Sequence, residues 1–187
     1  LPKAKPRRLT PHLKSVLKQK LDELLSNGFI RPSSSRCLSP IVLVFQHGKY
    51  RLCIDYRDLN ALTVIQTHPM PNPKDLFQAV AGSKYFAKID LKQGYYQILM
   101  ALRACWLTAF TTPFGNFEFL RIPFGLVCAP AHFQAEIERI LGTLLWNGAL
   151  VLIDDIIVYG NTIEEFLSRL EAVLSALTTA GLVCNIS

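Results

Sequence analysis

Two adjacent carboxylates, Asp154 and Asp155, interrupt an uncharged apolar run that extends from Ala149 to Tyr159. Valine, isoleucine and leucine on both sides predict two short strands, with the aspartates in the turn of a hairpin. An ionised carboxylate among apolar neighbours is costly unless a cation lies against it, and a divalent metal could serve two at once. Aspartate is also a common turn residue, because its side chain bonds the local backbone. Both interpretations are open at this point.

A third carboxylate, Asp90, ends a predicted strand at 85–90 and precedes Asp154 by 64 residues. If the hairpin lies beside that strand, the carboxylates converge and can hold a pair of hard cations. Mg²⁺ needs only one or two protein carboxylates and fills its octahedral shell with water and substrate phosphates. Two such ions can clamp the attacking and leaving oxygens of an in-line phosphoryl displacement. The three acids therefore indicate nucleotidyl transfer.

The elements that must position these acids follow in a clear order along the chain. Helix-capping and turn residues bound them, and the apolar spacing separates helices from strands. The predicted elements are a helix from Thr10-Pro11 to Asn27-Gly28, a hairpin of 41–45 with 50–55, a helix from Asn72-Pro73 to near Gly82, the strand 85–90, a hairpin of 107–111 with 116–121, a helix from Pro130 to Asn147-Gly148, the Asp154-Asp155 hairpin, and a helix from Thr162 to Gly181. This order predicts an α+β fold with helices packed on a largely antiparallel sheet. Residues 182–187 resemble the start of a strand with no partner after it, which predicts a fragment of a longer protein.

Length and composition restrict the class of protein. The chain has 187 residues, 50% of them hydrophobic and 18% charged, which predicts a globular domain with a somewhat apolar surface. No apolar run is long enough to span a bilayer, and the N-terminus lacks a signal peptide, so no membrane is expected. Five cysteines without C-x-x-C spacing predict buried free thiols in a reducing, intracellular compartment.

Positive charge is concentrated at the N-terminus. The chain carries a net charge of +6, and its first 20 residues hold seven lysines and arginines but no acidic residue. A basic arm on a near-neutral body is typical of a nucleic-acid binder, although a solvated terminus would have the same composition.

Four sequence blocks together resemble the reverse transcriptase of gypsy-class LTR retrotransposons. They occur in that family's order and spacing, and the resemblance covers about residues 9–186. The blocks are YRLCIDYRDLN at 50–60, KIDLKQGYYQI at 88–98, FLRIPFGLVCAPAHFQ at 119–134, and IDDI at 153–156. The resemblance implies the fingers and palm of a right-hand polymerase, with an antiparallel palm sheet packed on helices. It implies a basic arm and fingers helix at 1–40, fingers at 41–84, and a palm at 85–187 with a fingers insertion near 107–130.

The resemblance also implies roles for individual residues. Asp90, Asp154 and Asp155 would be the catalytic metal ligands, with the Leu91 carbonyl completing a shell around two Mg²⁺ ions, for which Mn²⁺ should substitute. The nucleotide would be held by Arg51, Lys49, Tyr95 and Phe124. Tyr95 matches the aromatic gate that selects dNTP over rNTP. The positions that match template or primer contacts are Asp55, Arg57, Pro123, Gly125 and Leu152.

Several positions depart from the family's pattern. Leu152 stands under the primer end, where the family usually has tyrosine, phenylalanine or methionine. The fingers turn 46–49 keeps one lysine instead of several, residues 100–107 are less polar than usual, and Val127-Cys128 replaces Thr-Asn. Such drift is typical of an element decaying without selection. An alternative function is therefore a non-catalytic palm domain that binds nucleic acid or a protein partner.

The resemblance implies partners beyond these residues. They are an RNA template, a DNA or tRNA primer and dNTP, together with the primer grip, thumb and RNase H regions of the same polyprotein. A cytoplasmic particle is the expected location. An RNA-templated RNA polymerase on the same palm is a third hypothesis, which Tyr95 disfavours.

Overall fold

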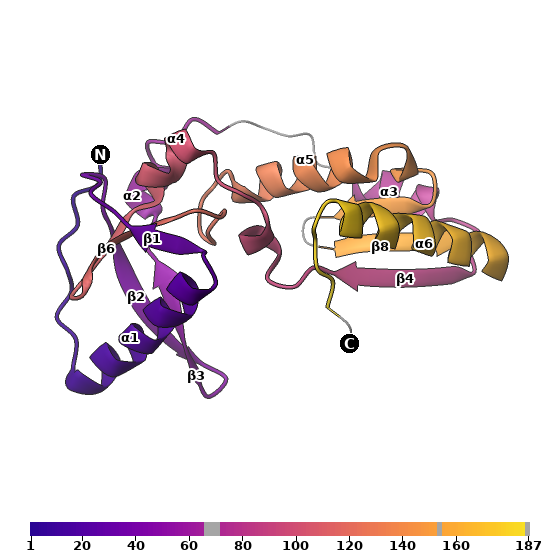
Figure 1. Ribbon diagram of the computed structural model, residues 1–187. Coiled ribbons are helices and arrows are strands. Elements are labelled where there is room, and N and C mark those ends of the chain that lie inside the picture. Colours follow the sequence, from indigo (N-terminus) through magenta and orange to yellow (C-terminus); the bar gives the residue numbers. More distant parts are fainter. Residues whose placement is uncertain (66–71, 153–154, 186–187) are drawn as a thin grey trace. The chain divides into compact units, whose positions relative to one another are not determined.

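The computed structural model of the chain describes residues 1–65, 72–152 and 155–185. The chain divides into two compact units (Figure 1). The first unit holds Leu1–Ile65 and Ile98–Ala129, and the second holds Gln66–Gln97 and Pro130–Ser187. The boundaries between fingers and palm inferred from the sequence stay a prediction.

The first unit begins with the helix that the sequence predicts. In α1 (Pro11–Ser26), Thr10 is the N-cap, and its Oγ1 accepts the backbone N–H of Leu13 at 3.4 Å. Pro11 suits the first turn because a backbone N–H at this position would have no intrahelical acceptor, so its absence costs no hydrogen bond. The helix ends at Asn27, and Gly28 follows with a φ of +66°.

A five-stranded sheet forms the body of the first unit, in the order β1-β6-β5-β2-β3. Its strands are β1 (Ile30–Pro32), β2 (Ser39–Gln46), β3 (Lys49–Ile54), β5 (Phe110–Thr112) and β6 (Gly115–Phe119). Neighbouring strands are antiparallel except β2 and β5, which pair in parallel. The turn between β2 and β3 has positive φ at both His47 and Gly48, as a two-residue hairpin requires. Both predicted hairpins of this unit are present, although the first strand of the second one begins only at Phe110.

Short helical turns close the first unit around an aromatic core. Phe110 packs against Phe117 and Phe119, with ring centroids 6.0 and 5.4 Å apart. The buried Tyr56 hydroxyl donates to the Thr108 carbonyl at 2.8 Å. The short elements are α2 (Arg57–Asn60), α4 (Leu102–Cys105) and η2 (Trp106–Thr108). The prediction of strand at 107–109 was wrong, because this segment continues the turn of α4.

The second unit is built on a three-stranded antiparallel sheet in the order β4-β8-β7. Its strands are β4 (Tyr85–Asp90), β7 (Ala149–Leu152) and β8 (Asp155–Gly160). The predicted Asp154-Asp155 hairpin therefore has its two strands, and β8 lies beside β4. Ile89, Ile156 and Val158 are buried. Successive side chains of a strand alternate between faces, so Lys88, Asp90 and Asp155 lie on the opposite face.

The remaining elements of this unit are helical. They are α3 (Pro73–Ala79), η1 (Gly94–Gln97), α5 (Ala129–Leu141), η3 (Gly142–Leu144) and α6 (Ile163–Thr179). The α6 helix packs on β8 and β4 through the buried Val173 and Leu177 (Figure 1). The α5 helix is shorter than predicted, because Gly142 has a φ of +52° and the last turn is 3₁₀. These layers confirm the predicted α+β fold.

The cysteines are only partly as predicted. All five are free, and Cys37 and Cys105 are buried, but Cys53 is exposed. Among the described residues, no helix is long and apolar enough to cross a membrane.

Candidate active site

Two of the three predicted metal ligands meet where β4 and β8 pair. Asp90 is the last residue of β4 and Asp155 the first of β8, and the two are direct cross-strand partners. Like charges directly opposite each other destabilise a sheet unless a cation lies between or beside them. Asp154 lies outside the described residues, and no cluster of three metal-binding side chains occurs among those that are described.

A lysine that the sequence analysis missed is bonded to this pair. Lys88 Nζ lies 2.8 Å from Asp155 Oδ2. The hydrogen bond and the negative charge of Asp155 raise the pKa of Lys88, and the charge of Asp90 adds to this effect. The Lys88 side chain is 64% exposed, so water screens the ion pair and reduces its strength. Its position two residues before Asp90, hence on the same face, could have identified it.

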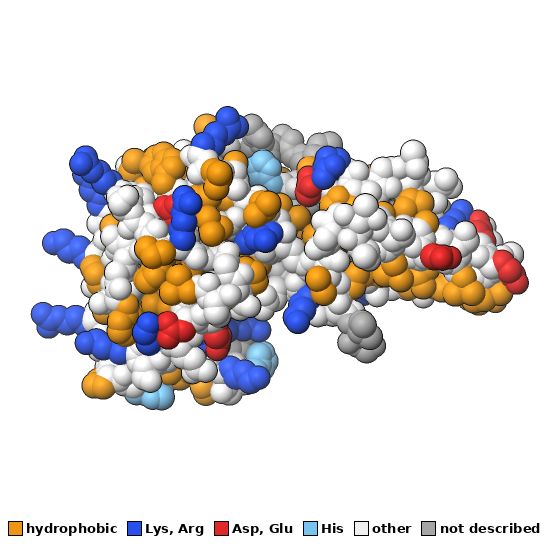
Figure 2. Space-filling view, in the orientation of Figure 1, with side chains coloured by type: hydrophobic (Ala, Val, Ile, Leu, Met, Phe, Trp, Pro, Cys, Tyr) orange, Lys and Arg blue, Asp and Glu red, His pale blue; other side chains and the backbone are white. Residues whose placement is uncertain are grey.

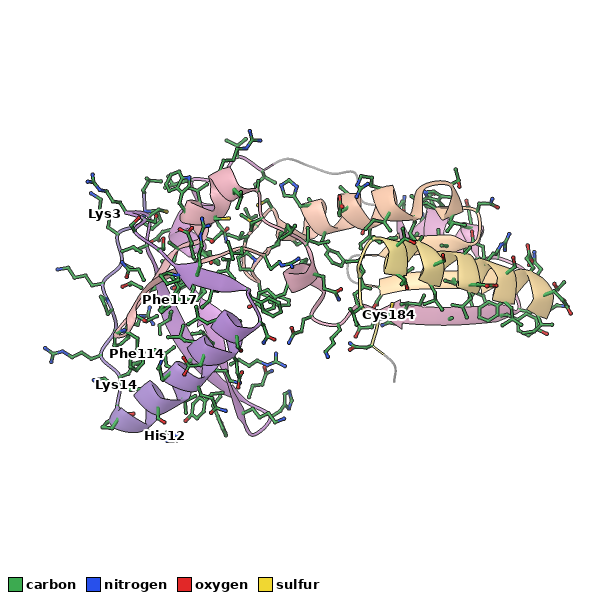
Figure 3. The ribbon with its side chains drawn as sticks, in the orientation of Figure 1. Lys3, His12, Lys14, Phe114, Phe117 and Cys184 are labelled. Carbon is green, nitrogen blue, oxygen red and sulfur yellow. The ribbon has the colours of Figure 1, made fainter. Side chains whose placement is uncertain are left out.

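The other carboxylate is bonded by a residue far along the chain. Asn185 Nδ2 donates to Asp90 Oδ2 at 2.7 Å, and the backbone N–H of Asn185 donates to the Asp90 carbonyl at 2.8 Å. Leu91 and Cys184 form an antiparallel bridge, and Figure 3 shows Cys184 beside the end of β4. Residues 182–185 therefore pair with chain that precedes them in the sequence, and the expectation that no partner follows them stays a prediction.

Gln97 bonds this returning segment from the other side. Its Nε2 donates to the carbonyls of Lys92 at 2.6 Å and Val183 at 2.9 Å. Its Oε1 accepts the backbone N–H of Val183 at 2.7 Å. The Gln97 side chain therefore joins the backbone near Lys92 to the backbone at Val183.

The donor atoms present suit a hard cation. Within the described residues, Oδ1 of Asp90 and Oδ1 of Asp155 accept no hydrogen bond, so each acid keeps one oxygen for a ligand. The Leu91 carbonyl accepts the Gly94 N–H at 3.1 Å, and a carbonyl retains a second lone pair. Carboxylate and carbonyl oxygens are the ligands that Mg²⁺ prefers. The described part of the site fits the predicted metal.

Tyr95 is held rigidly beyond the end of β4. It lies in η1, is 8% exposed, and packs edge-on against Phe133 with ring centroids 5.1 Å apart. A Cβ on Gly94 would lie 3.3 Å from the same Phe133 ring, so glycine lets this turn approach α5 closely. The packing fixes the orientation of the Tyr95 ring.

The predicted nucleotide cations lie on the exposed face of β3. Exposure alternates along the strand, with Lys49, Arg51 and Cys53 exposed and the intervening residues half-buried. Within the described part of the chain, the side chains of Lys49 and Arg51 make no hydrogen bond and no ion pair. Both cations are therefore available to an anionic ligand.

Asp55 and Arg57 are bonded to each other. Arg57 Nε lies 2.8 Å from Asp55 Oδ1, and Nη2 lies 2.6 Å from Oδ2. The Arg57 hydrogen bond is the largest of the effects that lower the pKa of Asp55 to about 2. The Arg57 side chain is 86% exposed, so one side of the guanidinium still faces water.

The segment around Phe124 is held by an asparagine. Asn60 Nδ2 donates to the Gly125 carbonyl at 2.8 Å, and Asn60 Oδ1 accepts the Val127 N–H at 2.9 Å. Gly125 has a φ of +95°, which favours glycine, so the backbone conformation alone accounts for a glycine at this position. Pro123 is buried, whereas Phe124 is 50% exposed.

The basic arm lies along the first unit. Ala4 N–H donates to the Leu38 carbonyl at 2.9 Å, and Leu38 N–H donates to the Pro2 carbonyl at 2.8 Å. Figure 2 shows Lys and Arg side chains standing out from the unit that carries the N-terminus, and Figure 3 labels Lys3 and Lys14 among them. The arm presents a positive surface.

Known proteins share both the sequence and the fold. The family described as "Reverse transcriptase (RNA-dependent DNA polymerase)" matches residues 40–187. The chain is 38% identical over 181 residues to the retrovirus-related Pol polyprotein from transposon opus of Drosophila melanogaster, a match that covers 94% of the chain and 18% of that polyprotein. It is 33% identical to the enzymatic polyprotein of Figwort mosaic virus, with 98% of the chain and 28% of that protein covered.

A solved structure agrees with these matches. The foamy viral protease-reverse transcriptase in complex with an RNA/DNA hybrid aligns with a TM-score of 0.85 and 26% identity, covering 97% of this chain and 24% of that one. This likeness confirms the fingers-palm fold class. The chain spans less than a third of the length of each of these relatives. Since the family pattern matches most of its residues, the chain belongs to the reverse transcriptase family.

Proposed function

We propose that this chain carries the polymerising site of an RNA-directed DNA polymerase from the polyprotein of a gypsy-class LTR retrotransposon. The observation that carries the proposal is the direct opposition of Asp90 and Asp155 at one exposed end of the β4–β8 pair. Two acids there require positive charge, and Lys88 supplies only part of it. The 38% identity to the opus polyprotein, against 33% to the plant-virus protein, supports a transposon origin.

Asp90, Asp154 and Asp155, with the Leu91 carbonyl, would hold two Mg²⁺ ions. Reverse transcriptases generally use Mg²⁺, and Mn²⁺ should substitute. Bound in this way, the ions would stabilise the charge that develops on the attacking and leaving oxygens when a primer 3′-hydroxyl joins a dNTP α-phosphate. The chain's own contribution is to orient these acids at the end of the β4–β8 sheet.

Other residues would bind and select the nucleotide. The Tyr95 ring would occupy the space that a ribose 2′-hydroxyl needs. Its edge-on packing against Phe133 supports this role, because a ring that excludes a hydroxyl must be held in place. Arg51 and Lys49 would bind the triphosphate. The guanidinium of Arg51 can donate to two phosphate oxygens at once. Phe124, half-exposed on a held segment, would contact the nucleotide.

The remaining predicted residues would contact the strands. Asp55, Arg57, Pro123 and Gly125 are proposed for the template, and Leu152 for the primer end. RNA template and a DNA or tRNA primer would be the partners, with thumb and RNase H regions of the same polyprotein and a cytoplasmic particle as the setting. The foamy viral relative was solved with an RNA/DNA hybrid, which supports nucleic acid as the ligand.

The test is primer extension on an RNA template. The active protein would be a chimera in which this chain replaces the matching segment of the opus polyprotein. We expect incorporation of dNTP, strong preference over rNTP, and loss of activity in Asp154→Asn. A folded chimera that extends no primer, beside an active opus parent, would contradict the proposal, and equal use of rNTP would indicate an RNA polymerase.

A second candidate, a non-catalytic domain that binds nucleic acid or a protein, is favoured by exposed apolar residues. Leu102 is 74% exposed, Trp106 41% and Val127 37%, at places where the family's pattern is more polar. Metal binding separates the two candidates. If the chain binds no more Mn²⁺ than its Asp90→Asn/Asp154→Asn variant, as measured by water-proton relaxation, the second candidate is correct.

A further inference from the structure

We propose that Asn185 is a positioning residue for Asp90, and that Gln97 holds in place the segment that carries Asn185. The assignment rests on the proposed function, because it concerns Asp90 as a metal ligand. The family resemblance quoted for this chain assigns no role to either amide.

Asn185 bonds Asp90 at two places, the backbone carbonyl and the carboxylate. The backbone bond fixes the distance between the two chain segments, and the side-chain bond then fixes the rotation of the carboxylate. Oδ2 receives the amide, while Oδ1 accepts no hydrogen bond within the described residues. A neutral donor stabilises the ionised acid without competing as a cation for the metal, unlike Lys88 on Asp155.

Gln97 makes the placement of Asn185 dependable. Three bonds join its amide to the backbone of Lys92 and Val183, two residues after Asp90 and two before Asn185. Lys92 N–H also donates to the Val183 carbonyl at 3.0 Å. The Gln97 amide thus joins the two segments on one side of the Leu91–Cys184 bridge, and Asp90 and Asn185 lie on its other side.

A purely structural role would depend on the backbone alone. The bridge, the Asn185 N–H and the buried Leu182 would keep residues 182–185 in place whatever the side chain at 185. The two roles can therefore be separated, because a substitution at 185 removes the carboxylate bond and leaves the backbone bonds intact.

The experiment measures Mn²⁺ binding to the whole chain by electron paramagnetic resonance, with the thermal unfolding midpoint as a check on folding. We expect Asn185→Leu to raise the Mn²⁺ dissociation constant about 10-fold, as loss of a partner of a metal ligand typically does. Asn185→Gln, which keeps an amide donor, should lose less. Asn161→Leu, at an exposed asparagine before α6 in the same unit, is the matched control and should change nothing.

Two further measurements keep the test independent of one variant. Gln97→Leu should weaken Mn²⁺ binding similarly and speed hydrogen exchange at the Val183 amide, whose acceptor it removes. If Asn185→Leu does not fold, Asn185→Ser replaces it, because the serine hydroxyl is one bond shorter than the amide. The ¹⁵N resonance of the Asn185 side-chain amide should differ between the unaltered chain and the Asp90→Ala variant.

The outcomes distinguish this inference from the proposed function. Equal Mn²⁺ binding by the unaltered chain and folded Asn185→Leu, with binding lost in Asp90→Asn, would overturn the role of Asn185 and leave the polymerase proposal standing. Mn²⁺ binding no stronger in the unaltered chain than in Asp90→Asn would overturn both. Selective weakening in Asn185→Leu and Gln97→Leu supports the inference.

Discussion

The two sheets of this chain hold their charged residues in opposite ways. On β3, Lys49 and Arg51 are exposed, and their side chains make no hydrogen bond or ion pair within the described residues. At the end of β4 and β8, by contrast, Asp90 is bonded by Asn185 and Asp155 by Lys88. Metal ligands must be oriented before the metal arrives, whereas a cation that follows an incoming triphosphate must be able to move. With the roles proposed above, the difference would separate side chains that are fixed before a ligand binds from those that respond to it.

The largest effect should come from removing one of the exposed cations of β3 in an active chimera. Arg51→Ala should raise KM for dNTP about 10-fold with little change in kcat, because a charge-assisted bond to a phosphate contributes to ground and transition states alike. Steady-state primer extension measures both constants. Arg103→Ala, at an exposed arginine of the same unit, is the control. A fall in kcat at constant KM, or weaker Mn²⁺ binding, would break the contrast between the sheets.

A smaller effect should come from the ion pair between Lys88 and Asp155 at the end of β4 and β8. Lys88→Met removes a cation that competes for Asp155, so it should tighten Mn²⁺ binding by about 2- to 5-fold, a modest gain because water screens this exposed pair. Titration followed by electron paramagnetic resonance measures the change. Lys92→Met, at a nearby exposed lysine, should leave the affinity unchanged. Weaker binding in Lys88→Met would show instead that the ion pair orients Asp155 for the metal.

The smallest effect concerns Asp55, a fixed acid within the first unit. Arg57 lowers its folded-state pKa from 3.8 to about 2, so the pair stabilises the fold above about pH 4 and this stabilisation is lost as the pH falls toward 2. Because the Arg57 side chain is 86% exposed, Asp55→Asn should cost less than about 1 kcal/mol near pH 7. Urea unfolding of both proteins should give curves that converge between pH 4 and pH 2. Asp58→Asn serves as the control, and a stability difference that persists at pH 2 would contradict the pairing.

Local patterns were sufficient to predict most of the elements. Thr10 and Thr162 cap the helices that their spacing predicts, and each accepts a backbone N–H three residues on. The pattern of residues 85–90 predicts a strand that ends at Asp90, and the structure confirms that end and pairs Asp90 with Asp155. The exposed Cys53 was missed although the signal was present, because it shares the polar phase of β3 with Arg51.

The amides around Asp90 could not be predicted in the same way. Asn185 is 95 residues from Asp90, and Gln97 is 86 residues from Val183. Asparagine near glycine is typical of a turn, and nothing local distinguishes an amide that bonds a distant backbone from one that faces water. The role of Asp154 stays a prediction, since it lies outside the described residues.

The order in which the units occur along the chain has a consequence for how the protein is made. Each unit is assembled from two separate stretches, so β1 waits for β6 and β4 waits for β8 before either sheet is complete. Asp155, the partner of Asp90 in β8, follows it by 65 residues, which a ribosome takes about 3–13 s to add at typical rates. During that interval the nascent strand around Asp90 has an unpaired edge. The proposed polymerising site should therefore be among the last parts of the chain to assemble, and chaperone binding to nascent chains should be greatest while β4 waits for its partner.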